Sequence, residues 1–247
     1  AAVRAPATTG VRGGYRLSTD NYSTEQFSFE ATVAEEELEN ADSPLKLDQD
    51  ASAFALEKLL IQLEVAASTQ LFTAGSYNSS LDVSGTTYWS NDLADWYSQI
   101  VTGQETIQAA TGQRANNAIM GVQVFNTLKK HADFLERIKY TGTGGVIPSA
   151  VAKRALAELL EVDNLHVGEA IYNTADEVQT ASYSFVWGKS CALLYQAPAP
   201  GLKTFSFAKR FVRAGYDFRV ERYQLSDGKN ADAFRVLHEY DLKIVDN

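Results

Sequence analysis

The stretch Asn117-Ala-Ile-Met-Gly-Val-Gln-Val-Phe-Asn-Thr-Leu-Lys-Lys-His131 contains two successive hydrophobic patterns. Residues 117–121 form a short apolar run, which is typical of a buried strand. The next residues carry apolar side chains at helical spacing, which predicts a helix over about 123–131. A buried strand followed directly by an amphipathic helix favours a fold that mixes helices and strands.

The segments that follow this stretch predict one more helix and then several strands. Pro148 is suited to the first turn of a helix that reaches Glu161. Residues 197–201, Ala-Pro-Ala-Pro-Gly, read as a linker, and Asp227-Gly228 reads as a turn. Strands are predicted over residues 165–172, 183–195, 204–224 and 232–246.

The segments before the stretch predict two longer helices. Residues 49–72 carry apolar side chains at helical spacing after a candidate cap at Asp48 or Asp50, and such a helix is roughly 36 Å long. Its apolar stripe is wide, so we expect neighbours on more than one side. The second helix follows Asn91 or Asp92 as its cap and ends at Gly112; its apolar face comprises Leu93, Trp96, Tyr97, Ile100 and Val101.

The N-terminal residues predict an arm and a hairpin. Residues 1–14 have no hydrophobic period, whereas Phe27, Phe29, Ala31 and Val33 alternate with polar residues. With a turn at Asp20-Asn21, residues 11–33 read as a long two-stranded hairpin. An isolated hairpin is marginally stable in water, so we expect neighbouring subunits to cover its apolar side.

The composition excludes several classes of protein. Cys191 is the only cysteine, and the three histidines lie far apart in the sequence, so we expect neither a disulfide nor a metal site. The net charge of −9, from 31 acidic and 22 basic residues, argues against tight binding to nucleic acid. No apolar run is long enough to cross a membrane. We expect no cofactor.

Candidate catalytic features are weak throughout the chain. The glycine-rich loop Thr141-Gly-Thr-Gly-Gly145 lacks the Lys-Ser/Thr ending of a phosphate-binding loop. Cys191 lies in an apolar run that is typical of a buried structural thiol. The acidic run Glu35, Glu36, Glu37 and Glu39 reads as a solvated face. These observations predict a structural protein and not an enzyme.

The order of the motifs resembles the major capsid proteins of tailed phages. The opening stretch is followed by Glu136-Arg-Ile-Lys-Tyr140, and later by Val167-Gly-Glu-Ala-Ile-Tyr-Asn-Thr-Ala175. Val186-Trp-Gly-Lys, Ala192-Leu-Leu-Tyr195 and a late Tyr240-Asp-Leu-Lys-Ile-Val245 complete the similarity, which covers nearly the whole chain.

This resemblance implies an α+β chain with the Hong Kong 97-type capsid fold. Its parts would be an N-terminal arm (residues 1–14), an E-loop hairpin (15–44), a P domain (45–112) with its long spine helix at about 49–72, an A domain (113–200), and strands that return to the P domain (201–247).

The implied function is self-assembly into an icosahedral phage head that encloses double-stranded DNA without sequence-specific binding. The partners would be copies of the same chain in pentamers and hexamers, together with portal, scaffold and cement proteins. The subunit would be assembled in the host cytoplasm and located in the virion. Two alternatives are a compartment shell like the encapsulins and, from a different class, a soluble enzyme whose site forms only on folding.

Charged residues near the N-terminus are candidates for contacts between subunits. We expect Arg4, Arg12 and Arg16 to pair with the acidic surface of Glu35, Glu36 and Glu37 on a neighbouring copy. Some relatives join their subunits through a lysine of the E-loop, but residues 1–45 contain no lysine, and Lys46 is the first. We therefore expect no covalent cross-link of that kind.

Overall fold

The computed structural model describes residues 9–10, 13–14, 19–42, 44–73, 81, 87–139, 149–176, 178–199, 201, 206–226 and 230–245. In this part of the chain, helices and strands alternate irregularly, as expected for an α+β protein. The helices are α1 (Glu35–Asn40), α2 (Leu47–Phe72), α3 (Trp96–Thr111), α4 (Val122–Leu128), α5 (Ala132–Lys139) and α6 (Ser149–Leu159). The strands are β1 (Glu25–Ala34), β2 (Asn117–Gly121), β3 (Asn164–Gly168), β4 (Ile171–Asn173), β5 (Tyr183–Phe185), β6 (Cys191–Leu194), β7 (Ala208–Val212), β8 (Arg219–Gln224) and β9 (Ala231–Ile244).

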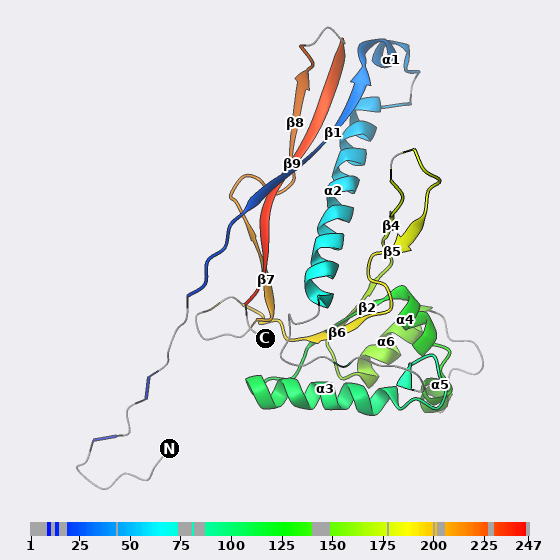
Figure 1. Ribbon diagram of the computed structural model, residues 1–247, viewed down its shortest axis with the longest axis vertical. Coiled ribbons are helices and arrows are strands. Elements are labelled where there is room, and N and C mark those ends of the chain that lie inside the picture. Colours follow the sequence, from blue (N-terminus) through cyan, green and yellow to red (C-terminus); the bar gives the residue numbers. More distant parts are fainter. Residues whose placement is uncertain are drawn as a thin grey trace.

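These elements form an elongated molecule with two parts (Figure 1). In the upper part, α2 runs beside a sheet made of β1, β7, β8 and β9. In the lower part, helices α3 to α6 lie beside the sheet β3-β2-β6. The strands β4 and β5 pair only with each other and project from the lower part.

The upper sheet is organised around β9, which pairs antiparallel with β1, β7 and β8. Of the hairpin predicted over residues 11–33, the second strand is β1, which pairs with β9 along its whole length, from Glu25 opposite Tyr240 to Ala34 opposite Ala231. Residues 11–12 and 15–18, which hold most of the predicted first strand, lie outside the described residues. The described residues between 19 and 24 form no strand. A period of two residues shows which face of a strand is apolar, but it does not show which strand is its partner.

The apolar face of β1 packs against α2 of the same chain. The rings of Phe29 and Phe54 meet edge to face with centroids 5.8 Å apart, and Ala55 and Leu59 of α2 form a small core with Val236. Part of the cover of this face therefore comes from α2 of the same chain, and the expected cover by a neighbouring subunit stays a prediction.

Helix α2 confirms the long helix predicted at 49–72 and begins two residues earlier. Neither Asp48 nor Asp50 caps it, because the cap residue is Lys46 and makes no side-chain hydrogen bond to the helix. Both carboxylates instead lie in the first turn, where negative charge interacts favourably with the helix dipole.

Helix α3 begins later than the predicted cap at Asn91 or Asp92. The N–H of Ser98 donates to Oδ1 of Asp95, which caps the helix, at 3.0 Å. Leu93 therefore lies before the helix and is 91% exposed, although its spacing had placed it on the apolar face. The helix ends as predicted at Gly112, whose positive φ of 72° suits glycine.

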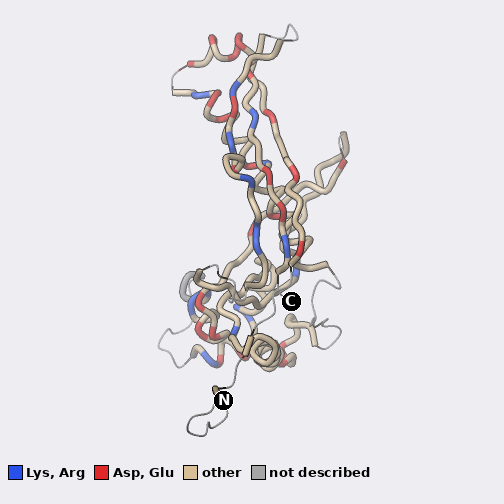
Figure 2. The backbone as a smooth tube through the Cα atoms, turned by 90° about the vertical axis from the view of Figure 1, so that its left-hand side faces the viewer, with Lys and Arg blue, Asp and Glu red and all other residues tan. Residues whose placement is uncertain are grey.

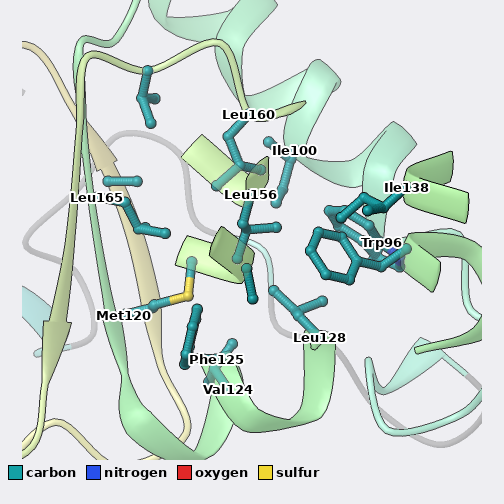
Figure 3. Close-up of a cluster of buried hydrophobic side chains, with 14 residues drawn as sticks. Trp96, Ile100, Met120, Val124, Phe125, Leu128, Ile138, Leu156, Leu160 and Leu165 are labelled. Atoms are coloured by element: carbon teal, nitrogen blue, oxygen red, sulfur yellow. The ribbon is translucent and has the colours of Figure 1, made fainter. Parts of the chain in front are cut away.

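The lower core lies between the sheet β3-β2-β6 and the surrounding helices. Figure 3 shows Trp96, Leu156 and Met120 converging there from α3, α6 and β2. The side chain of Gln104, which is also buried, accepts from the N–H of Ala115 at 3.0 Å and donates to the carbonyl of Leu160 at 3.3 Å. The predicted strand at 117–121 is confirmed.

Three predicted strands are each divided in two. The segment 165–172 becomes β3 and β4, 183–195 becomes β5 and β6, and 204–224 becomes β7 and β8. The breaks fall where the chain leaves one sheet for another, or turns back within one, as at Gly215 with its φ of 82°. The glycine-rich loop 141–145, Pro148 and the turn at Asp227-Gly228 lie outside the described residues.

Candidate assembly surfaces

Six charged residues were predicted to form contacts between subunits, and only the three glutamates lie in the described part of the chain. Arg4, Arg12 and Arg16 lie outside it. Glu35, Glu36 and Glu37 form the first turn of α1 and are exposed. Acidic residues are visible at this end of the molecule in Figure 2. The predicted pairing of these carboxylates with arginines of another copy stays a prediction.

Helix α2 exposes apolar side chains on both flanks of its contact with the sheet. Within this 26-residue helix, only Ala55, Leu59 and Ser68 are buried. Phe54, which touches Phe29 of β1, is still 47% exposed, and Leu60 is 43% exposed. A helix that is apolar around its circumference is normally buried on all sides. These exposed apolar positions of α2 are therefore a candidate contact surface.

The opposite face of the upper sheet carries charges that neutralise one another. Arg235 forms ion pairs with Glu221 at 2.6 Å and with Glu30 at 3.7 Å, and Arg219 also pairs with Glu221, at 3.1 Å. The hydrogen bond from Arg235 lowers the pKa of Glu221. Since these carboxylates already have cationic partners, this face has less need of a charged partner from outside.

The β4–β5 hairpin presents a second exposed apolar face. Ile171 lies opposite Phe185, and Asn173 lies opposite Tyr183. Side chains of directly opposed residues share one face of a sheet, so Ile171, Phe185 and Tyr183 lie together, and all three are exposed. A two-stranded sheet with one apolar face is marginal in water, so this hairpin is a further candidate contact surface.

Within the described residues, no group of three or more His, Cys, Asp or Glu side chains could hold a metal ion. Burial raises the pKa of the half-buried Cys191 thiol to about 12, so it is protonated and a poor nucleophile near neutral pH. No helix of the described part is both long and apolar enough to cross a membrane.

His131, the histidine of the opening stretch, has a structural role. It is buried, its Nε2 lies 3.1 Å from the carbonyl oxygen of Asn91, and its Nδ1 accepts from the N–H of Asp133 at 3.3 Å. These two bonds join the segment before α3 to the start of α5. The side chain therefore positions two parts of the lower core.

His238 is buried in the upper sheet between aromatic rings. Its ring stacks on Phe218 at 4.1 Å and on Tyr240 at 4.6 Å. Burial lowers the pKa of His238, and the charge of Arg210 lowers it further, while the backbone of Tyr216 and the carboxylate of Asp217, 3.5 Å from Nδ1, act in the opposite direction. The neutral imidazole is therefore favoured in the folded chain.

This burial predicts a pH-dependent loss of stability. Because the pKa is lower in the folded state than the usual 6.5, the unfolded chain binds more protons, and the free energy of unfolding should fall as the pH drops below about 6.5. Urea titrations between pH 7 and 5 should show a smaller pH slope for His238→Gln than for the unsubstituted chain. The exposed His166 gives a control, and His166→Gln should keep the full slope. Equal slopes for all three would contradict this account.

Sequence comparison relates this chain to proteins of known function. It is 28% identical to the major capsid protein of Burkholderia phage BcepMu over 209 residues, which cover 80% of this chain and 64% of that protein. The chain is related to the major capsid proteins of phages. The major capsid protein of Pseudomonas phage JBD67 is 25% identical over 185 residues, with 74% of this chain and 57% of that protein covered. This chain thus spans less than two thirds of the length of either phage protein.

Structural comparison shows that this chain shares its fold with solved structures. A phage-related protein from Bordetella bronchiseptica matches with a TM-score of 0.72 and 22% identity, covering 90% of this chain and 73% of that chain. The virus-like particle from Pyrococcus furiosus matches with a TM-score of 0.53 and 13% identity, with the same coverage. No protein-family model matches the chain. The resemblance to phage major capsid proteins is confirmed.

Proposed function

We propose that this chain is the major capsid protein of a tailed phage and assembles with copies of itself into an icosahedral head. The observation that carries the proposal is its similarity, over most of its length, to two phage major capsid proteins. The exposed apolar side chains of α2 support it, because a partner normally covers positions of this kind. The work of this protein would be done by its interfaces and not by a catalytic centre.

We further propose that the parts of the molecule correspond to the Hong Kong 97-type arrangement expected from the sequence. In this assignment, α2 is the spine helix of the P domain, and β7, β8 and β9 are the strands that return to it. The lower part, with α3 to α6 and the sheet β3-β2-β6, holds most of the A domain. Since α3 belongs to the lower core, we place the boundary before it, and not at residue 113. Residues 15–44 then contribute β1 to the P-domain sheet.

The enclosed cargo would be double-stranded DNA, held without sequence-specific contacts. A chain with a net charge of −9 suits a wall around DNA better than a tight binder of phosphates. We place the subunit in the virion, in pentamers and hexamers, after assembly in the host cytoplasm. Portal, scaffold and cement proteins would be its further partners.

Electron microscopy of the purified chain, combined with a nuclease-protection assay, tests the proposal. We expect closed particles of uniform size, and DNA that survives nuclease when particles are isolated from infected cells. Uniform particles that carry protein cargo and no protected DNA would instead support a compartment shell. A chain that stays monomeric at micromolar concentration, even with its phage's scaffold protein present, would contradict both.

The predicted arginine contacts give a second test. Arg12→Glu together with Arg16→Glu should lower the yield of particles several-fold, because many weak pairs of about 0–1 kcal/mol each are repeated over the shell. Sedimentation would measure the assembled fraction. Adding Glu35→Arg and Glu36→Arg should restore part of the yield if these groups pair. Unchanged assembly in the arginine variant would exclude the pairing.

A further inference from the structure

Two glycines meet at the end of the lower sheet. Strands β2 and β3 run parallel, and their last residues, Gly121 and Gly168, lie opposite each other. Neither residue carries a side chain, so the pair leaves a bare patch of backbone on the sheet. A feature of this kind marks a place where another segment approaches closely.

The segment that occupies this patch is Trp187-Gly188. A Cβ atom placed on Gly168 would lie 2.0 Å from Cδ1 and 2.3 Å from Cγ of Trp187. A Cβ atom placed on Gly121 would lie 2.1 Å from the carbonyl oxygen of Gly188. Cγ lies at the root of the indole ring and cannot move without rotating the whole side chain, so neither position has room for alanine. Gly188 itself has a φ of 53°, which also favours glycine.

The same segment contacts the lower end of α2. The rings of Trp187 and Phe72 meet edge to face with centroids 6.2 Å apart. One turn earlier in the helix, Oγ of Ser68 donates to the carbonyl of Val186 at 2.8 Å. Ser68 is one of the few buried residues of α2. Residues 186–188 therefore contact both the upper and the lower part of the molecule.

We infer that residues 186–188, with Gly121 and Gly168, form a joint that sets the angle between α2 and the lower sheet. The indole ring acts as a spacer whose position is fixed by the bare backbone on one side and by Phe72 on the other. Helix α2 is about 39 Å long, so a tilt of about 10° at the joint moves its far end by about 7 Å. If the proposed function holds, this angle contributes to the curvature of the shell.

Distance measurements on the unassembled chain test this inference directly. Spin labels at Glu57→Cys on α2 and Glu105→Cys on α3, in a Cys191→Ala background, report the distance between the two parts. Both label positions are exposed. Gly168→Ala should shift the mean distance between the two labels by more than about 2 Å. The indole ring of Trp187 must move far enough to remove its overlap with the added methyl group. Gly103→Ala is the matched control in the lower part, where the added Cβ meets only Cδ1 of Leu193, at 3.3 Å, and the distance should stay unchanged.

A double substitution separates the joint from a general disturbance of the fold. In a Trp187→Leu background the obstacle is removed, so adding Gly168→Ala should change the distance by less than half as much. The inference is overturned if Gly168→Ala leaves the distance unchanged, or if its full effect persists without the indole. Should Gly168→Ala fail to fold, Trp187→Phe provides the test, because the smaller ring should broaden the distance distribution, and an unchanged width would also overturn the inference.

The outcome is independent of whether the chain forms a head. A shifted distance in a chain that never assembles would support the joint and count against the proposed function. Uniform particles together with an unchanged distance would support the proposed function and count against the joint.

Discussion

Replacing Phe54 and Leu60 with glutamate should abolish the formation of particles and leave the subunit folded. Both side chains lie on α2 and are about half exposed in the isolated chain. In an assembled shell these positions would be covered, and an unpaired carboxylate buried there costs several kcal/mol. Because that cost recurs at every copy, we expect the assembled fraction to fall at least tenfold, as measured by sedimentation and electron microscopy.

Two controls establish what this substitution does. Leu60→Met keeps the apolar character and a similar volume, so it should assemble normally. Circular dichroism and urea unfolding of the glutamate variant should show a folded subunit, with a loss of about 1 kcal/mol from the ring contact between Phe29 and Phe54. Normal particle yield from the glutamate variant would show that these positions of α2 stay in solvent.

Trp96→Ala should destabilise the subunit by about 3–5 kcal/mol, because it leaves a large cavity in the lower core. Trp96 has no exposed surface and lies among the side chains of α4, α5 and α6 (Figure 3). Its ring also contacts that of His131, with centroids 6.2 Å apart. Such a loss approaches the whole stability of many single domains. Urea unfolding monitored by far-ultraviolet circular dichroism measures it.

A smaller substitution at the same position separates packing from hydrogen bonding. Within the described residues, Nε1 of Trp96 has no hydrogen-bond partner, so Trp96→Phe loses volume alone and should cost roughly 1–2 kcal/mol. Trp89 provides the contrast, since its Nε1 donates to Oε1 of Gln99 at 2.6 Å. If Trp96→Phe proved as damaging as Trp96→Ala, the indole N–H would have to bond to a group that the described residues do not include.

The helices and the lower-sheet strand could be predicted because their signals are local. The spacing of apolar residues in 47–72 and the run at 117–121 depend only on neighbours in the sequence. The glycine that ends α3 is a local signal too. The boundary at the start of α3 was misjudged because Leu93 continues the helical spacing by chance, while the capping carboxylate is Asp95.

The partner of β1 and the joint at Trp187 could not be predicted, because both depend on contacts between distant residues. Alternation in β1 identified its apolar face, but its cover by α2 and its pairing with β9 appear only in the folded chain. Gly121, Gly168 and Trp187 were visible as parts of three motifs. No pattern in the sequence shows that the two glycines lie opposite each other and make room for the indole.

The position of β9 in the sequence has a consequence for synthesis. The chain joins residues as far apart as Ser23 and Asp241, which are 218 positions from each other. At about 5–20 residues per second, β1 emerges from the ribosome roughly 10–40 seconds before its partner strand exists. During that interval its unpaired edge can join the wrong strand, including the same strand of another nascent chain. Efficient production of this protein should therefore depend on chaperones that hold the first half of the chain until the last strand arrives.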